Sequence, residues 1–377
     1  MDTAPDSSGM VPPPPPVIAA PPPPKPRRGR GWMIFAIILL VLLLVSLFGN
    51  FAQLVSQALT FKGGLGNGIS REAGPNLDEC LIKDNDAANK VAVITVDGII
   101  SGQTVDQAGN NMVDVIKAQL DRAKGDRRVK AVILKVDSPG GEVLASDEIY
   151  RAINDFEKDS GKPVVCSMGS LAASGGYYIS SPCRWIVAND LTITGSIGVI
   201  LHTWNYRGLM DKIGLRPEVF KSGKFKDMLS GERETNEIPA EERVMVQGLI
   251  DVTYQKFKDV VAAGRDAAHA RNKKEGRALA LDWTNYADGR VLSGTQAYDL
   301  GFVDEIGDFQ DAVDRAKQIA GIRNANLIEY RERYDFSNFL RLLGQTELSH
   351  SVKLDLGMEL PKLQAGELYF LSPTFIN

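Results

Sequence analysis

The chain has 377 residues, of which 44% are hydrophobic and 24% are charged, and its formal net charge is −4. This length allows two or three domains with a sizeable core. A weakly acidic balance provides no basic face, which argues against a nucleic-acid-binding protein. The three cysteines, Cys80, Cys166 and Cys183, are too few and too scattered for a metal site or a disulfide framework. A bridge between Cys166 and Cys183 stays open at this point.

The first segment is rich in proline and ends in the basic cluster Lys25–Arg30. Such a composition cannot bury a core, so residues 1–31 are expected to form an extended cytoplasmic tail. The following run, Trp32–Phe48, carries no charge and is almost wholly apolar. With the residues up to Val55 it reaches the ~20 residues that cross a bilayer. The basic residues before it place the N-terminus in the cytoplasm, so we predict a single-pass transmembrane helix over residues 32–52.

A polar, glycine-containing stretch over residues 53–88 is typical of a linker. After it, apolar runs alternate with segments of helical spacing, which predicts an α/β fold with a parallel sheet, flanking helices and right-handed crossovers. The expected strands are residues 91–96, 130–136, 163–168 and 184–188, with a weaker one at 217–220. The expected helices are residues 112–124, 142–158, 241–270 with a break near Gly264, and a last helix ending at residue 320. Residues 322–377 are expected to form an irregular tail.

Two loops at expected strand ends are rich in small residues. In open α/β sheets, ligand-binding and active sites usually lie at such strand ends. The two loops are Ser138–Gly141 and Gly169–Gly175. The second loop carries Ser174 between a strand and an amphipathic segment, where free N–H groups stabilise developing negative charge. This arrangement favours a nucleophile. The alternatives are a packing turn for the second loop and a type II turn with Pro139 for the first.

A serine nucleophile needs a base within hydrogen-bond reach. Of the three histidines only His202 lies in the expected core, and no carboxylate lies beside it in sequence to orient the ring. A lysine in an apolar pocket is the other possibility, because its charged form is disfavoured there and the free amine can accept the serine proton. The candidates are Lys221, Lys224 and Lys226, although most lysines are solvated surface charges. Physical reasoning alone does not choose among them.

Several motifs, in the same order, resemble the signal peptide peptidase A family. They are DSPGG at 137–141, ASGGYY at 173–178, TGSIG at 194–198, KSGKFKD at 221–227 and a pattern beginning DGRV at 288 and ending at Asp304. The likeness covers about residues 90–320 and fits the short, single-repeat form of the family. It implies a ClpP/crotonase-like peptidase domain over residues 89–321, followed by a C-terminal extension over residues 322–377.

The resemblance also implies roles for individual residues. Ser174 is the nucleophile, and Lys226, 52 positions later, is the general base. Ser196 hydrogen-bonds the lysine amine and holds it in place. The backbone N–H of Gly175 is one oxyanion donor.

The same resemblance implies that the backbone N–H of either Gly140 or Gly141 is the second oxyanion donor. Glycine suits this role because no side chain blocks the approaching tetrahedral oxygen. No metal and no cofactor is expected.

The family resemblance further implies a membrane-anchored serine endopeptidase that degrades cleaved signal peptides and other unfolded apolar peptides. It implies the bacterial inner membrane, with the catalytic domain on the periplasmic side, and a ring- or dome-shaped homo-oligomer in which serine and lysine can come from neighbouring subunits. In short family members the C-terminus can occupy the substrate groove, and the apolar end Leu368–Ile376 suits that role or a membrane or subunit contact. The alternatives are a crotonase-fold acyl-CoA enzyme and a non-catalytic membrane scaffold.

Overall fold

The computed structural model describes residues 35–46, 75–103, 110–332 and 368–371 of the chain, which divides into two units between Glu72 and Ala73. In the first unit, residues 35–46 form a helix whose large apolar side chains are 52–65% exposed. Among all described residues, no helix is both long enough and apolar enough to span a membrane. The expected cytoplasmic tail lies outside the described residues, as do residues 32–34 and 47–52 of the expected span.

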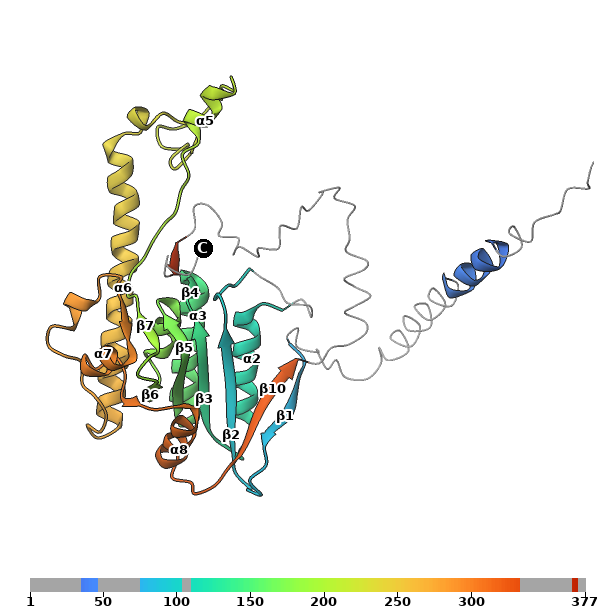
Figure 1. Ribbon diagram of the computed structural model, residues 1–377, viewed down its shortest axis with the longest axis vertical. Helices are drawn as coiled ribbons and strands as arrows, with labels where there is room; N and C mark the ends of the chain where they lie inside the picture. Colours follow the sequence, from blue (N-terminus) through green and yellow to red (C-terminus); the bar gives the residue numbers. More distant parts are fainter. Residues whose placement is uncertain (1–34, 47–74, 104–109, 333–367, 372–377) are drawn as a thin grey trace, which may run out of the picture. The chain divides into compact units, whose positions relative to one another are not determined.

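The second unit is organised around one large, mostly parallel sheet (Figure 1). The strands are β1 (Leu77–Lys83), β2 (Lys90–Asp97), β3 (Val129–Ser138), β4 (Gly140–Glu142), β5 (Val164–Ala173), β6 (Trp185–Ala188), β7 (Ile193–Gly195), β8 (Val291–Ser293), β9 (Glu305–Ile306), β10 (Asn326–Glu332) and β11 (Tyr369–Leu371). The main order is β1-β10-β2-β3-β5-β6-β9, parallel throughout except for the antiparallel edge strand β1. β7 pairs in parallel with the end of β5 and antiparallel with β8. A separate small sheet joins β4 to β11.

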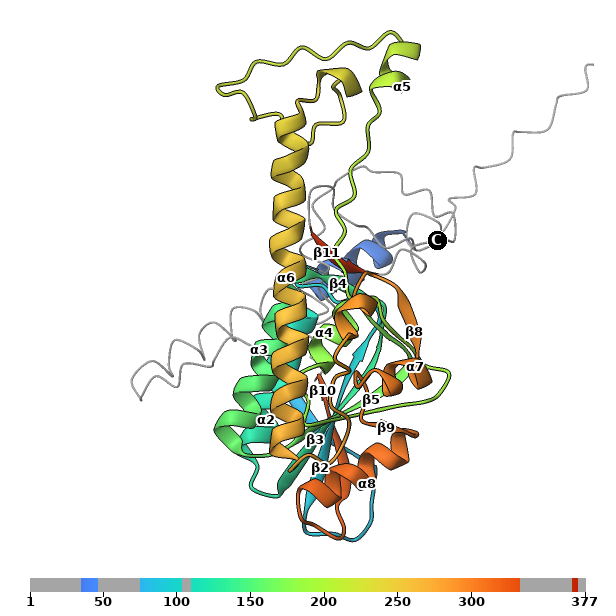
Figure 2. The same cartoon turned by 90° about the vertical axis from the view of Figure 1, so that its left-hand side faces the viewer.

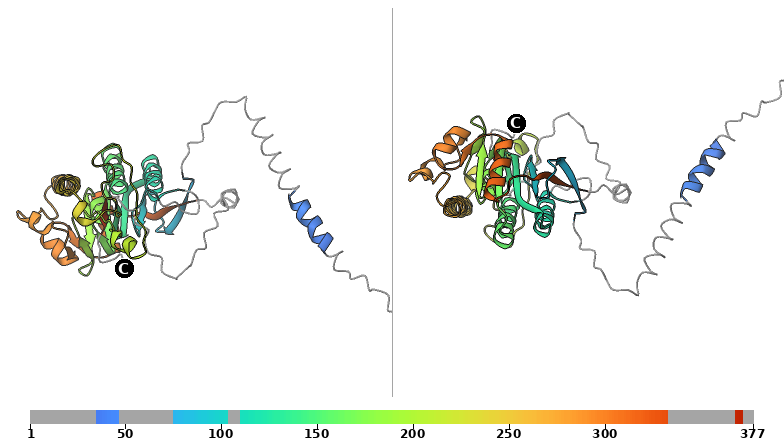
Figure 3. Two further views of the ribbon diagram at one scale, coloured as in Figure 1. Left: turned by 90° about the horizontal axis from the view of Figure 1, so that it is seen from above. Right: turned by 90° about the horizontal axis from the view of Figure 1, so that it is seen from below.

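Helices cover both faces of the main sheet. The helices of this unit are α2 (Met112–Gly125), α3 (Val143–Ser160), α4 (Gly175–Ser180), α5 (Arg207–Lys212), α6 (Ala240–Arg271), α7 (Gly294–Asp299) and α8 (Phe309–Ile319), with short 3₁₀ helices η1 (Thr235–Glu237) and η2 (Trp283–Tyr286). The larger core contains residues of α2, α3, α4 and α6, and the smaller core lies under α8. Figure 2 and Figure 3 show this arrangement from the side, from above and from below.

The strand β2 shows why the sheet is covered on both sides. Its residues Ala92 and Ile94 belong to the larger core, whereas Val91 and Val93 belong to the smaller one. Successive side chains of a strand point to opposite faces, so a continuous apolar run requires cover on each face. The four strands predicted from such runs are confirmed as β2, β3, β5 and β6.

Besides β11, two longer segments outside the expected peptidase domain are strands. Residues 77–83, expected in the linker, form β1, and residues 326–332, expected in the tail, form β10. β10 pairs with β1 on one side and with β2 on the other, so the prediction of irregular structure is wrong for both segments. The strand expected at residues 217–220 is also wrong, because these residues form no strand and Phe220 is 88% exposed.

The break expected near Gly264 does not occur, and α6 continues through it to Arg271. A Cβ atom at Gly264 would lie 2.5 Å from the carbonyl oxygen of Ser181. The glycine therefore serves close packing of α6 against the turn after α4, and it does not end the helix.

Residues 201–239, here called the arm, connect the sheet to the start of α6. In Figure 1 and Figure 2, α5 lies beyond the N-terminal end of α6, away from the sheet. Within the arm, the Tyr206 N–H donates to the Gly231 carbonyl at 3.0 Å, and the Arg233 guanidinium ties the arm to Glu242 at the start of α6. The N-terminal half of α6 thus extends beyond the core that buries the C-terminal half.

A buried ion pair fixes the C-terminal half of α6 to the sheet. Arg265 is 1% exposed, pairs with the Asp304 carboxylate and donates to the Cys183 carbonyl at 3.1 Å. Asp304 also accepts a hydrogen bond from the Ile186 N–H of β6 at 2.8 Å. Helix, sheet and the segment before β9 therefore meet at one charged pair.

We expect Asp304→Ala to lower the free energy of unfolding by about 3–5 kcal/mol, because it leaves the Arg265 charge buried without a partner. Urea unfolding followed by circular dichroism measures the loss. Asp288→Ala is the control, since its ion pair with Arg290 has side chains 51% and 49% exposed, and its loss costs no more than about 1 kcal/mol. Equal losses in the two variants would contradict this account of the ion pair.

Candidate active site

Ser174 occupies a strained turn between a strand and a helix. β5 ends at Ala173, Ser174 has φ 55° and ψ −116°, and α4 begins at the next residue. Its N–H donates to the Gly195 carbonyl at 2.8 Å, which fixes the turn. Its side chain is buried, and among the described residues none hydrogen-bonds its Oγ atom. Strained backbone and an unpaired buried hydroxyl both cost free energy, and features of this kind concentrate at functional sites.

Three glycines near the Ser174 turn have no room for a side chain. A Cβ atom at Gly175 would lie 3.0 Å from Gly140 Cα and 3.1 Å from Gly141 N. A Cβ atom at Gly140, whose φ is +99°, would lie 2.5 Å from Gly175 N. The structure therefore brings together the three glycines among which the family resemblance placed the two oxyanion donors.

Ser196 also lies beside the nucleophile candidate. In the parallel pairing of β5 with β7, Ala173 is opposite Gly195, so Ser174 and Ser196 each follow directly after a paired residue. Ser196 is 4% exposed, has φ 49°, and donates its N–H to the Arg290 carbonyl at 2.8 Å. The register of the two strands thus places both hydroxyls at the same end of the sheet.

Lys226 is not part of this cluster within one chain. It lies on the arm between α5 and η1, and it is exposed. His202, the other base considered, is exposed at the start of the arm. The Ser174 hydroxyl contacts neither residue by a hydrogen bond.

The three candidate lysines differ in their partners. Lys221 Nζ lies 2.8 Å from both carboxylate oxygens of Asp227, and Lys224 Nζ pairs with Glu241. Within the described part of the chain, Lys226 Nζ makes no comparable ion pair. Lys226 is therefore the one lysine of these three whose amine pairs with no carboxylate among the described residues.

A short segment of the C-terminal extension lies against the glycine strand. β11 pairs antiparallel with β4, with Phe370 opposite Gly141 and Leu371 opposite Gly140. On its other side, Tyr369 exchanges two backbone hydrogen bonds of 3.1 and 3.2 Å with Ile200. The family resemblance allowed the end of the chain to lie in the substrate groove, but the sequence did not predict which residues β11 pairs with, because the pairing joins residues far apart in sequence.

The buried cysteines form neither a disulfide bond nor part of a metal site in the described part of the chain. Cys166 and Cys183 are buried free thiols, and Cys166 Sγ lies 3.3 Å from Ser180 Oγ. In the described ranges, no group of three or more histidine, cysteine, aspartate or glutamate side chains is arranged to hold a metal ion.

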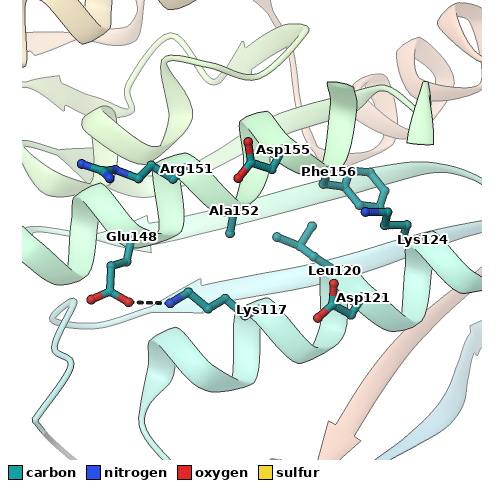
Figure 4. A pocket seen from close by; sticks show the side chains of 9 residues that line it. All are labelled: Lys117, Leu120, Asp121, Lys124, Glu148, Arg151, Ala152, Asp155 and Phe156. Atoms are coloured by element: carbon teal, nitrogen blue, oxygen red, sulfur yellow. Dashed lines mark hydrogen bonds and ion pairs between the residues drawn. The ribbon is translucent and has the colours of Figure 1, made fainter. Parts of the chain in front are cut away.

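A surface cavity of about 300 Å³ lies between α2 and α3 (Figure 4). Its lining residues are Lys117, Leu120, Asp121, Lys124, Glu148, Arg151, Ala152, Asp155 and Phe156. The Lys117–Glu148 ion pair crosses it, and none of the predicted site residues contributes to its wall. We therefore place the candidate active site at the Ser174 turn.

Comparison with known proteins finds peptidases that are similar to this chain. The family model described as peptidase family S49 matches residues 156–323, which include Ser174 and Lys226. The chain is 39% identical over 233 residues to a candidate protease of Synechocystis sp., an alignment that covers 62% of this chain and 75% of that protein. It is 34% identical over 262 residues to a candidate signal peptide peptidase SppA of Enterococcus faecium, covering 68% of this chain and 71% of that protein.

Longer relatives match over part of their length. Against Protease 4 of Haemophilus influenzae the identity is 35% over 242 residues, which is 64% of this chain and 36% of that protein. A solved structure of a membrane-bound stomatin-specific protease aligns with 66% of this chain and all of its own, at 15% identity. The TM-score of this alignment is 0.38.

We expect Gly141→Ala to slow fluorophosphonate labelling of Ser174 by about 10²- to 10³-fold, the usual cost of losing one oxyanion donor. The added Cβ atom would lie 1.9 Å from the Ile100 carbonyl oxygen, so β4 has to move. Gly125→Ala is the control, because that position at the end of α2 has nothing within 4 Å. Labelling is measured by mass spectrometry over time. An unchanged rate in Gly141→Ala would remove β4 from the oxyanion site.

Proposed function

Because the chain belongs to peptidase family S49, a family of serine-type peptidases, we propose that it is a membrane-anchored endopeptidase with a Ser174–Lys226 dyad. Its fold is then the ClpP/crotonase-like form of the observed α/β architecture. The observation that carries the proposal is the Ser174 turn, where an unbonded hydroxyl lies beside three glycine backbones. Membership in a peptidase family also argues against the acyl-CoA enzyme and the non-catalytic scaffold.

The proposed reaction proceeds through an acyl-enzyme. The neutral Lys226 amine takes the Ser174 Oγ proton while Oγ attacks the peptide carbonyl carbon. Backbone N–H groups of Gly175 and of Gly140 or Gly141 hydrogen-bond the resulting oxyanion. The lysine then protonates the leaving amine, and afterwards it takes a proton from the water that hydrolyses the ester. Ser196 orients the amine throughout.

We further propose that the dyad is completed between subunits. Lys226 is exposed on the arm and makes no hydrogen bond to Ser174 Oγ of its own chain, which supports its delivery to a neighbour. The arm exposes an unusual amount of apolar surface: Trp204, Tyr206, Leu209, Ile213, Leu215, Val219 and Phe220. Large exposed apolar surfaces mark association sites, and a second copy of this chain is the partner that would use it. Burial of the amine in such an interface disfavours its charged form.

We also propose that a transmembrane helix over residues 32–52 anchors the protein in the membrane. The charge-free run over residues 32–52 contains the described helix at 35–46, whose apolar side chains are exposed as those of a lipid-facing helix would be. With the basic cluster before it on the cytoplasmic side, the catalytic domain lies outside the bacterial inner membrane. The substrates proposed are signal-peptide remnants and other unfolded apolar peptides that reach this side of the membrane.

Ser174→Ala and Lys226→Ala should each abolish hydrolysis of a fluorogenic apolar peptide, whereas Lys224→Ala should retain it. Mixing the two inactive variants tests the shared dyad. If the subunits form a head-to-tail ring, a random 1:1 mixture should regain about a quarter of wild-type activity, because that fraction of sites combines an intact serine with an intact lysine. Hydrolysis by either single variant would exclude the dyad. An inactive mixture, shown by light scattering to be co-assembled, would place both residues in one chain.

The β11 segment occupies the position where an extended substrate would pair with β4, so we propose that it competes with substrate. Deleting residues 365–377 should raise the rate of peptide hydrolysis about tenfold at low substrate, because a tethered competitor acts at a high effective concentration. The same deletion in the Ser174→Ala chain should remain inactive. An unchanged rate after deletion would show that the segment does not compete.

A further inference from the structure

β11 shows how an extended peptide lies in the site. It runs between β4 and Ile200, with backbone pairing on both sides, and the Val143 N–H donates to the Leu368 carbonyl at 3.3 Å. Backbone pairing of this kind accepts almost any sequence. Selectivity must therefore come from the pockets that receive the side chains.

The pairing register identifies Phe370 as the residue whose carbonyl faces the oxyanion glycines. The point where a Gly140 Cβ atom would sit is 2.0 Å from the Phe370 carbonyl oxygen and 2.5 Å from Gly175 N. The Phe370 carbonyl oxygen therefore lies next to the glycines whose N–H groups the proposed reaction assigns to the oxyanion. A substrate bound in the same register has its acyl-side residue at the position of Phe370.

The Phe370 ring fills an aromatic pocket. It is 0% exposed and stacks on Tyr178 with ring centroids 4.9 Å apart and planes 25° apart. Its centroid is 4.7 Å from that of Phe257, at an interplanar angle of 53°. Tyr178 and Phe257 in turn meet edge to face at 5.0 Å. Such ring pairs add stabilisation beyond the area they bury.

The walls of this pocket are fixed by other parts of the fold. The Tyr178 hydroxyl donates to Asp147 at 2.8 Å, and Tyr150 contacts its ring edge to face at 5.5 Å. Burial, together with the hydrogen bond to Asp147, raises the pKa of Tyr178 far above its ordinary value, so the hydroxyl stays a donor. Phe257 lies on the half of α6 that Arg265 ties to the sheet. The pocket therefore keeps its shape, and it fits a planar ring.

We infer that the pocket formed by Tyr178 and Phe257 selects peptides with an aromatic side chain at the residue whose carbonyl is attacked. Phe257 is then a specificity-determining residue that takes no part in the chemistry. The inference rests on the proposed peptidase function, and it narrows the substrate class from apolar peptides to peptides cut after phenylalanine or tyrosine.

The test uses the full-length protein and two peptides that differ only by Phe or Ala at one central position. We expect kcat/KM to be about 10- to 100-fold higher for the Phe peptide, which is the range for burying one such side chain. Mass spectrometry should show the cut directly after the Phe. The tail competes equally with both peptides, so the ratio is independent of it. A ratio near one, or a cut elsewhere, overturns the inference.

Variants locate the preference in the structure. Phe257→Ala should lower kcat/KM for the Phe peptide about tenfold and leave the Ala peptide within about twofold, because only the larger side chain loses a contact. Phe302→Ala is the matched control: Phe302 is also fully buried, but its ring contacts Tyr177 at 5.6 Å and not Tyr178. An equal drop of the ratio in both variants would attribute it to general loosening of the core and would overturn the role of Phe257.

The results of these experiments distinguish a failure of the aromatic preference from a failure of the proposed peptidase function. Hydrolysis that depends on Ser174 but shows no aromatic preference overturns the inference alone. Hydrolysis that persists in Ser174→Ala, or no hydrolysis of either peptide by the wild-type protein, overturns the proposed function and the inference together. If Phe257→Ala does not fold, the wild-type ratio of kcat/KM for the two peptides and the position of the cut still test the aromatic preference.

Discussion

Close approach of backbone to backbone at Gly140, Gly141 and Gly175 is the constraint on which the site depends. A side chain at any of the three would overlap main-chain or buried atoms, with Cβ distances down to 1.9 Å. Because these positions are glycines, β4 can lie against the Ser174 turn. The strained turn itself depends on the register of β5 with β7, which supplies the hydrogen bond from Ser174 N–H to Gly195.

Much of this was readable from the sequence, because the information is local. Continuous apolar runs predicted the four central strands, and small residues around Ser174 predicted the turn that presents it. The edge pair β1 and β10 was missed, since Leu77–Lys83 and Asn326–Glu332 are stabilised by each other across most of the chain. The pairing of β11 with β4 and the contact of Phe370 with Phe257 were missed for the same reason. The hydrophobic periodicity of one segment does not indicate which distant segment it pairs with.

The position of Lys226 could not be predicted from the sequence for a different reason. Its motif matched the family pattern, but spacing along the chain does not say whether two side chains meet. The arm carries it out from the core, and the two neighbouring lysines of the motif are paired with Asp227 and Glu241. The nucleophile is thus fixed by the sheet, whereas its proposed base is fixed by an extension with few contacts to that sheet. Such a division makes assembly a condition of activity in the proposed function.

The helix α6 has two halves with different environments. Phe257, Val260, Val261, Gly264 and Ala268 are buried at helical spacing, so this half has its partner within the chain. In the other half Met245, Leu249 and Val252 follow the same spacing but are 39%, 53% and 73% exposed. A newly synthesised subunit carries this second stripe in water until something covers it, and transiently exposed apolar surface promotes aggregation. Correct self-association and misassembly therefore compete for the same surface during biogenesis.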